Sequence, residues 1–235
     1  MSLLTIIQNV CKRVGVASPT TASGSADIQI QQMIALANEE GEELSERYVW
    51  SALQTEATFV TLAAQLQGTV ASIATNNFRY IISDTIWNRT QNRPMYGSLT
   101  PSDWQLLTSS NISGPFQEYR IQGGNLYLKP APPAGETCAF EYISGNWCQS
   151  QGGTKQSSWS LDADTGILDE KIMTAGTIWR WKQVKGMDYA EDFRKYEIRV
   201  VQAMERDAGK PTLSMDGSPT NRAHGIMVPS GSWPL

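Results

Sequence analysis

The residues that could carry out acid–base, nucleophilic or metal chemistry are few in this chain. It contains a single histidine, His224, and no Gly-x-Ser-x-Gly, phosphate-loop or His-Glu-x-x-His motif. A catalytic base must hold a fixed position within hydrogen-bond reach of its substrate, and His224 lies in a stretch that we do not expect to fold alone. One histidine also excludes any site that needs two. We therefore predict no catalytic residue, no cofactor site, no metal site and no enzymatic activity.

The densest carboxylates form the run Glu39-Glu40-Gly41-Glu42-Glu43, followed by Glu46. A helical period spreads these side chains around an outer face, which is typical of a solvated acidic surface. The functional alternative is a surface that repels DNA phosphate or docks on a basic partner. The candidate channel or docking residues on this acidic helix face are Glu39, Glu42, Glu43 and Glu46.

A second group of acids surrounds Gly166. Asp162, Asp164 and Asp169 resemble part of a calcium loop, but the spacing lacks the closing bidentate glutamate of an EF-hand. Turns and helix capping explain these residues equally well.

The three cysteines, Cys11, Cys138 and Cys148, fit no metal or redox spacing. We expect reduced, buried thiols. The sequence leaves open whether Cys138 and Cys148 pair across strands.

Helices at both ends of the chain would position these residues. Apolar residues recur at helical spacing from Leu3 to Gly15 and across 27–46, where Gly41 lies on the apolar stripe and would allow close approach of another helix backbone. Two more helices, near 168–185 and 188–208, are separated by a short turn and should form an antiparallel hairpin. The helix near 168–185 should be largely buried.

The middle of the chain has β texture. Short β-branched and aromatic runs alternate with turn residues, and Gly123-Gly124 favours a hairpin over 119–128. One helix, capped by Thr100, should interrupt the region at 101–108. We predict an α+β fold: a helical bundle of residues 1–54 and 165–209, an inserted β-rich domain of residues 55–164, and an extended C-terminal tail of residues 210–235.

Composition excludes several classes of protein. The 235 residues carry a formal net charge of −4, which disfavours tight binding to nucleic acid because that affinity comes from neutralising phosphates. No apolar run approaches the roughly 18 residues of a membrane span, and the Met1-Ser2-Leu3-Leu4 start does not resemble a signal peptide. Charged residues make up only 18% of the chain, below the roughly 25% of an ordinary soluble protein. Uncharged polar residues take their place, which suits surfaces that contact neighbouring proteins.

Several motifs, taken in order, resemble a known family. The motifs are Leu3-Leu4-Thr5-Ile6-Ile7, Asn38-Glu39-Glu40-Gly41-Glu42-Glu43-Leu44 with Trp50, Trp87-Asn88-Arg89-Thr90, Pro130-Ala131-Pro132, Phe140-Glu141-Tyr142-Ile143 and Asp188-Tyr189-Ala190-Glu191-Asp192. They are similar to motifs of podovirus-type phage head-to-tail adaptors, also called tail tubular protein A-like or head-completion proteins. The resemblance covers about residues 1 to 210. None of these motifs is catalytic.

The resemblance implies a structural virion protein in the neck or tail, made in the host cytoplasm. It implies a helical domain beneath the portal protein, a β-rich domain facing the tail nozzle or another tail protein, and identical subunits in a ring, commonly of twelve. Genomic DNA would pass through the channel without sequence-specific binding, and no membrane is involved. A C-terminal extension often reaches into the portal. Here the candidate anchors on residues 210–235 are Ile226, Met227, Val228, Trp233 and Leu235.

Two alternative functions stay open. Trp147, Trp159 and nearby acids could form a sugar-stacking site, which would make the chain a carbohydrate-binding or depolymerising tail protein. Core and edge packing in a small β domain is the commoner role of such aromatics. The chain could also be another neck or tail-completion component with the same architecture and a different neighbour.

Overall fold

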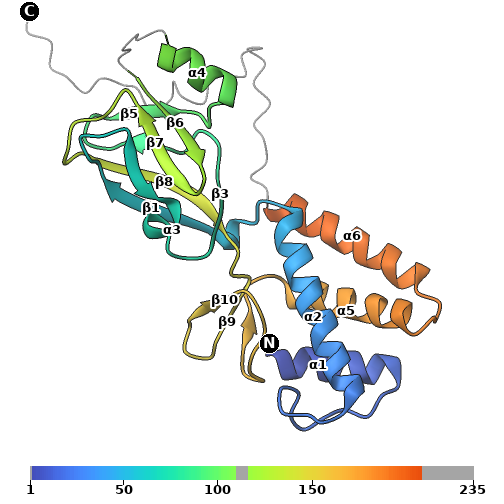
Figure 1. Ribbon diagram of the computed structural model, residues 1–235. Coiled ribbons are helices and arrows are strands. Elements are labelled where there is room, and N and C mark those ends of the chain that lie inside the picture. The colour runs from blue at the N-terminus through green and yellow to red at the C-terminus, as the bar shows by residue number, and fades with distance from the viewer. Residues whose placement is uncertain (1, 110–115, 208–235) are drawn as a thin grey trace, which may run out of the picture.

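The computed structural model describes residues 2–109 and 116–207, which form a helical unit and a β-rich unit (Figure 1). Helices from both ends of the described chain build the helical unit, and the β-rich segment is inserted between them. The predicted α+β class is confirmed. No helix within the described ranges combines the length and apolar character that a membrane span needs.

Four long helices form the helical unit: α1 (Leu3–Val14), α2 (Ile28–Arg47), α5 (Glu170–Val184) and α6 (Ala190–Asp207). Side chains cap three of them, because an oxygen of Ser2, Asp27 or Asp169 accepts a hydrogen bond from a backbone N–H of the first turn. Gly15 ends α1 with a left-handed φ of 76°, a conformation that costs glycine little. These helix ends agree with the sequence signals.

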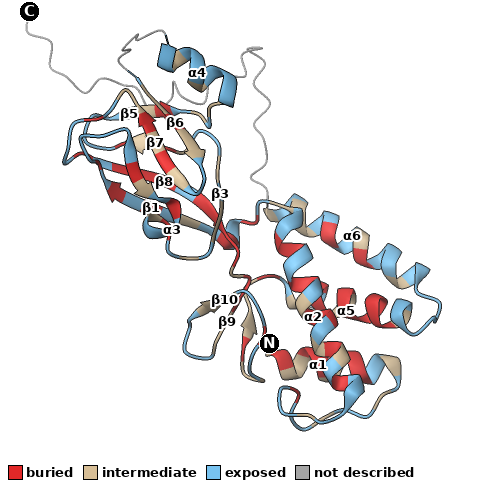
Figure 2. Cartoon of the chain, viewed as in Figure 1, coloured by how far each residue is buried: buried red, intermediate tan, exposed pale blue. Residues whose placement is uncertain are grey.

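Helix α5 is the central element of this unit. It packs against α1, α2 and α6, and most of its length is buried (Figure 2). Burial on several sides explains why its sequence has no clean polar face. The predicted buried helix and the helical hairpin with α6 are both confirmed.

A small three-stranded sheet lies against the helical unit. Its strands are β9 (Cys148–Gln149), β10 (Lys155–Gln156) and β11 (Thr165–Gly166), in the order β10-β9-β11. Trp147 and Trp159, which flank β9 and β10 in the chain, belong to the apolar cluster of the helices. We expected the β-rich domain to extend through residue 164. The segment around Trp147 and Trp159 instead packs with the helices, because its two large rings fill their core.

The β-rich unit is built on a single larger sheet with the order β1-β8-β4-β5-β6-β7-β2, and β3 also pairs with β8. Pairing is antiparallel except between β5 and β6. The strands are β1 (Gln54–Val60), β2 (Leu66–Thr69), β3 (Phe78–Ile81), β4 (Trp87–Asn88), β5 (Arg93–Tyr96), β6 (Gln117–Gln122), β7 (Asn125–Lys129) and β8 (Thr137–Ser144). A 3₁₀ turn at Ser51–Leu53 precedes β1, and the short helix α3 (Val70–Ile73) follows β2.

Local signals located most elements of this unit correctly. The β6–β7 hairpin turns through Gly123 and Gly124, which have positive φ of 58° and 75°. Helix α4 (Pro101–Ser109) starts at the predicted cap, where the backbone N–H of Asp103 donates to Thr100 Oγ1 at 3.2 Å. The unit has its own apolar core, separate from that of the helices, which includes Phe140.

Candidate interaction surfaces

The three free cysteines and the aspartates have structural roles. Cys11, Cys138 and Cys148 are buried and unpaired. Burial raises the pKa of the Cys138 and Cys148 thiols to about 12, so both are protonated at neutral pH. Within residues 2–109 and 116–207, no cluster of His, Cys, Asp or Glu is arranged to hold a metal ion.

The aspartates near Gly166 organise turns, in agreement with the capping interpretation. Asp162 Oδ1 accepts the backbone N–H groups of Ala22 and Ser23 at 3.0 and 2.7 Å. Asp164 Oδ2 accepts those of Ser160 and Leu161, both at 2.8 Å. These hydrogen bonds lower the pKa of Asp164 although burial opposes them.

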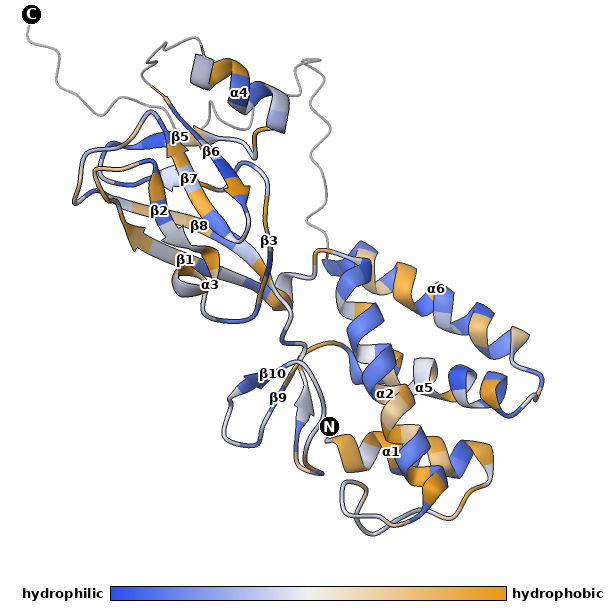
Figure 3. Ribbon diagram, viewed as in Figure 1, coloured by the Kyte–Doolittle hydropathy of each residue, from blue (hydrophilic) through white to orange (hydrophobic). Residues whose placement is uncertain are grey.

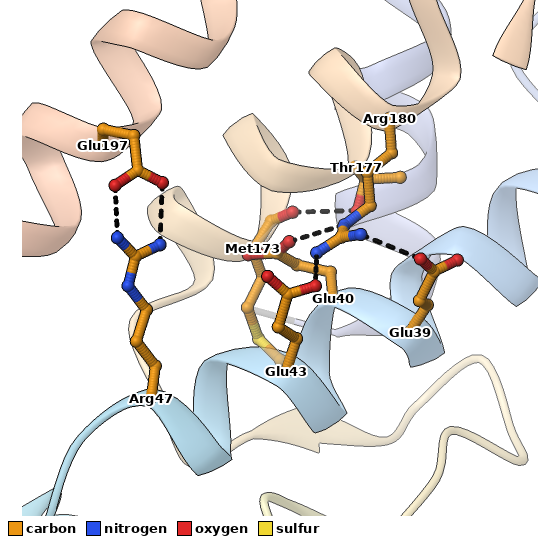
Figure 4. Close-up of polar contacts among 8 residues, drawn as sticks. All are labelled: Glu39, Glu40, Glu43, Arg47, Met173, Thr177, Arg180 and Glu197. Atoms are coloured by element: carbon orange, nitrogen blue, oxygen red, sulfur yellow. Dashed lines mark hydrogen bonds and ion pairs between the residues drawn. The ribbon is translucent and has the colours of Figure 1, made fainter. Parts of the chain in front are cut away.

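The carboxylates of α2 surround one buried guanidinium (Figure 4). Arg180 of α5 donates through Nε to Glu40 and through NH1 to Glu39, both at 2.9 Å, and through NH2 to Glu43 at 2.5 Å. Its side chain is only 6% exposed. A buried cation requires such partners, since an uncompensated charge in a core is costly. The cluster therefore joins α2 to α5.

Glu40 is the member that the sequence did not distinguish from its neighbours. It is fully buried, whereas the helical period had been interpreted as spreading the whole run over an outer face. Burial raises its pKa to about 7, and hydrogen bonding by Tyr196 and Arg180 acts in the opposite direction. The signal was available in the period, because residue 40 follows Ala37 and precedes Leu44 on the apolar stripe.

The four predicted surface glutamates do lie on the outside of α2, whose second half is strongly hydrophilic (Figure 3). Glu39 and Glu43 pair with Arg180, and Glu46 pairs with Arg79 of the β-rich unit at 3.2 Å. Glu42 has no ion pair among the described residues. The role of Glu39, Glu42, Glu43 and Glu46 in a channel or in docking stays a prediction.

Two glycines make this arrangement possible. A Cβ on Gly176 of α5 would lie 2.0 Å from Cδ of Glu40, and one on Gly41 would lie 2.4 Å from the Trp147 ring. The predicted close approach at Gly41 is therefore real, but its partner is the Trp147 indole and not a helix backbone.

Trp147 and Trp159 are not available to stack on a sugar. Both are buried, and their rings pack edge to face with centroids 5.3 Å apart. The proposed sugar platform of these two side chains is therefore wrong, because the rings form part of the helical core.

The turn between α5 and α6 exposes large apolar side chains that the sequence had not marked as a surface. Tyr189 and Phe193 are 36% and 39% exposed, and Met187 beside them is 48% exposed. Trp179 packs edge to face against Phe193, with ring centroids 5.0 Å apart. Exposed aromatic and methionine side chains are typical of protein-binding surfaces.

The candidate portal-binding residues lie outside the described part of the chain. They are Ile226, Met227, Val228, Trp233 and Leu235, and they stay a prediction from the sequence.

No protein-family model matches the chain, and no curated protein matches it. Its function is therefore inferred from its own residues and their geometry.

Proposed function

We propose that this chain is a structural virion protein, a head-to-tail adaptor that forms a ring between the portal and the tail of a tailed bacteriophage. Each subunit would contribute to the wall of the DNA channel. The observation that carries the proposal is the order of the adaptor-like motifs along the chain, together with a helical unit built from both ends of that order. The protein would be made in the host cytoplasm and reside in the neck of the virion.

The positions of the motifs support this proposal. The first and second motifs form α1 and the acidic half of α2, and the last forms the start of α6. Trp50, which ends the second motif, donates from Nε1 to the backbone oxygen of Leu44 at 2.7 Å and closes the end of α2. The middle motifs include β4 and the central strand β8. The motif residues thus belong to the framework of both units.

The surfaces also suit such a role. Neighbouring subunits would supply the contacts for the exposed apolar residues at the α5–α6 turn, and the tail residues 210–235 would contact the portal. The β-rich unit would present its loops to the tail nozzle or another tail protein. A subunit with net charge −4 would let DNA pass without gripping phosphates.

Imaging of labelled particles tests the proposal. Purified virions that contain this chain with a surface tag would be incubated with gold-labelled antibody and viewed by negative stain. We expect gold only at the junction of head and tail. Label at the distal tail, together with binding of the full-length chain to a glycan array, would instead support the carbohydrate-binding alternative. Label at another neck position would support a tail-completion component.

A further inference from the structure

A basic groove lies where the start of α5 meets the C-terminal half of α6. Lys171 of α5 and Arg199 and Arg206 of α6 line this groove, which has a volume of about 300 Å³ and the buried Ile172 as an apolar wall. Asp169 is the one carboxylate among the described residues that line it, and its Oδ1 already accepts a backbone N–H at the start of α5. The groove is therefore positive, in a chain whose formal net charge is −4.

The three cations of the groove have no ion-pair partner among residues 2–109 and 116–207. Other cations of the helical unit do have one, since Arg47, Arg180 and Lys182 each pair with a carboxylate. Arg206 donates from Nε to the backbone oxygen of Gln202 at 3.0 Å, which directs its guanidinium back along the helix and leaves the two terminal nitrogens for a ligand. The groove thus offers donors and charge that the described chain does not use.

The basic side chains share one face of α6. Arg199, Gln202 and Arg206 follow one another at spacings of three and four residues, which places them along one side of the helix, and all three are exposed. The two arginines are about 10 Å apart along the helix axis. Phe193 lies nine residues before Gln202, on the opposite side of α6. Contact of a neighbouring subunit with the aromatic residues would therefore leave the basic face open.

The chemistry of this face suits a chain of phosphates. Arginine, lysine and glutamine side chains are common donors to nucleic-acid phosphates. Cations spread over about 10 Å of helix suit a ligand with repeated negative charges better than one small anion. Among the described residues, no aromatic ring lines the groove, whereas protein partners are usually held by aromatic anchors. Genomic DNA is the polyanion that the proposed function places beside every subunit.

We infer that Lys171, Arg199 and Arg206 contact phosphates of double-stranded DNA, and that this face of α6 is turned toward the channel. The inference rests on the proposed function and identifies which surface of the subunit meets the genome. Phosphate contacts carry no sequence information, so binding is independent of base sequence. Three exposed contacts on an acidic subunit are weak and sensitive to salt, which lets the DNA slide past them.

Titration of a DNA duplex with the full-length chain tests this inference. A fluorescein-labelled duplex of about 30 base pairs would be followed by fluorescence anisotropy over a range of salt concentrations. We expect a dissociation constant on the order of 10⁻⁴ M at about 20 mM salt, and equal affinity for duplexes of different sequence. A plot of the logarithm of the association constant against that of the salt concentration should have a slope of about −2.7, the value for three phosphate contacts.

Single substitutions assign the contacts to residues. Arg199→Gln and Arg206→Gln should each lower the affinity roughly tenfold at about 50 mM salt and make the slope shallower by about 0.9, because one phosphate contact is lost. Lys12→Gln is the matched control, since it removes the same charge from an exposed residue of α1. That residue lies near the other end of α6, where Arg13 pairs with Asp192 at 3.8 Å. The control should leave the slope unchanged, and circular dichroism would show that each variant keeps its helices.

A competitor distinguishes DNA from an acidic partner protein. Unlabelled duplex should displace the labelled duplex at a lower charge concentration than poly-glutamate does, because duplex DNA carries one charge per roughly 1.7 Å of axis. Stronger displacement by poly-glutamate would assign the groove to an acidic protein and overturn the inference.

Two further results would overturn it. They are the absence of binding at about 20 mM salt, and a control variant that changes the slope as much as the two arginine variants do. If gold marks the neck of the virion while DNA binding fails, the groove assignment is wrong and the proposed function stands. If the duplex binds as expected while gold lies elsewhere, the phosphate contacts stand, and the channel and the proposed function are wrong.

Discussion

At the scale of single residues, the burial of Glu40 and of Trp147 explains two glycines that are otherwise unfavourable in helices. Glycine costs about 1 kcal/mol relative to alanine inside a helix, yet α5 contains Gly176 and α2 contains Gly41. Both glycines face large groups of another element, the Glu40 carboxylate and the Trp147 indole. The helices thus give up intrinsic helix stability for a close approach between elements.

Substitution of Gly176 should therefore reverse the usual effect of alanine in a helix. We expect Gly176→Ala to lower the free energy of unfolding by about 1–3 kcal/mol, the range typical of overpacked cores, because the new methyl group would displace the Glu40 carboxylate. Urea denaturation monitored by circular dichroism measures this change. Gly152→Ala is the matched control, since its nearest neighbour would be the Ser150 hydroxyl at 3.8 Å. Stabilisation by Gly176→Ala would contradict the packing described.

The protonation of Glu40 should also make stability depend on pH. Its pKa is raised from 4.5 to about 7 by burial, with Arg180 and Tyr196 opposing and Glu43 assisting the rise. A carboxyl group whose pKa is raised in the folded state binds more protons folded than unfolded, so its contribution to stability is lost as pH rises. The loss should span pH 4.5 to 7.

The Glu40→Gln variant isolates this effect, because glutamine has a similar shape and does not titrate. Between pH 4.5 and 7 the wild-type chain should lose stability relative to Glu40→Gln, measured as the difference in free energy of unfolding in urea at each pH. A wild-type chain that gains stability over this window would mean that the ion pair with Arg180 outweighs burial.

At the scale of elements, the sequence predicted helix caps and turns correctly, but it did not predict the contacts between segments that are distant in the chain. The Thr100 cap, the Gly123-Gly124 turn and the stop at Gly15 each depend on neighbouring residues, so a short stretch of sequence contains the necessary information. The placement of Trp147 and Trp159 depends on which unit receives their rings. Their segment has β texture, but burial of two indoles against α2 decides where it packs.

The same limit applies to the candidate surfaces. The sequence located Glu39, Glu42, Glu43 and Glu46 on an outer face, because helical period alone decides exposure there. It did not predict Arg180 as the shared partner of the acidic run, since residues 39 and 180 meet only after α2 packs on α5.

The two separate cores predict that a cavity in one unit loosens that unit first. We expect Trp147→Ala to destabilise the helical unit by about 3–5 kcal/mol. Amide hydrogen exchange should become faster in α1, α2 and α5 than in the wild-type chain, while exchange in β8 changes less. Hydrogen–deuterium exchange read by mass spectrometry resolves these segments. Phe140→Ala, in the other core, is the matched control and should give the opposite order. Equal loss of protection in both units for each variant would show that they unfold together.

At the scale of the whole molecule, the described helices and strands all precede the candidate portal-binding segment, residues 210–235. The last described helix is fixed at its end by the hydrogen bonds that Ser51 donates to Asp207, and the described residues of both apolar cores precede residue 208. We therefore expect removal of residues 210–235 to leave the melting temperature within about 2 °C of the full-length chain, because every described core residue and helix cap is kept.

Attachment to the portal should respond differently. If Ile226, Met227, Val228, Trp233 and Leu235 anchor the chain, virions assembled with the truncated protein should contain less of it and fewer should carry tails. Aromatic and aliphatic anchors supply most of the energy of such contacts. Counts of tailed particles by negative stain and immunoblots of purified virions measure both effects. A full-length chain with Lys210→Ala and Asp216→Ala is the matched control, since it keeps every anchor. Normal, DNA-filled, tailed particles from the truncation would exclude the anchoring role.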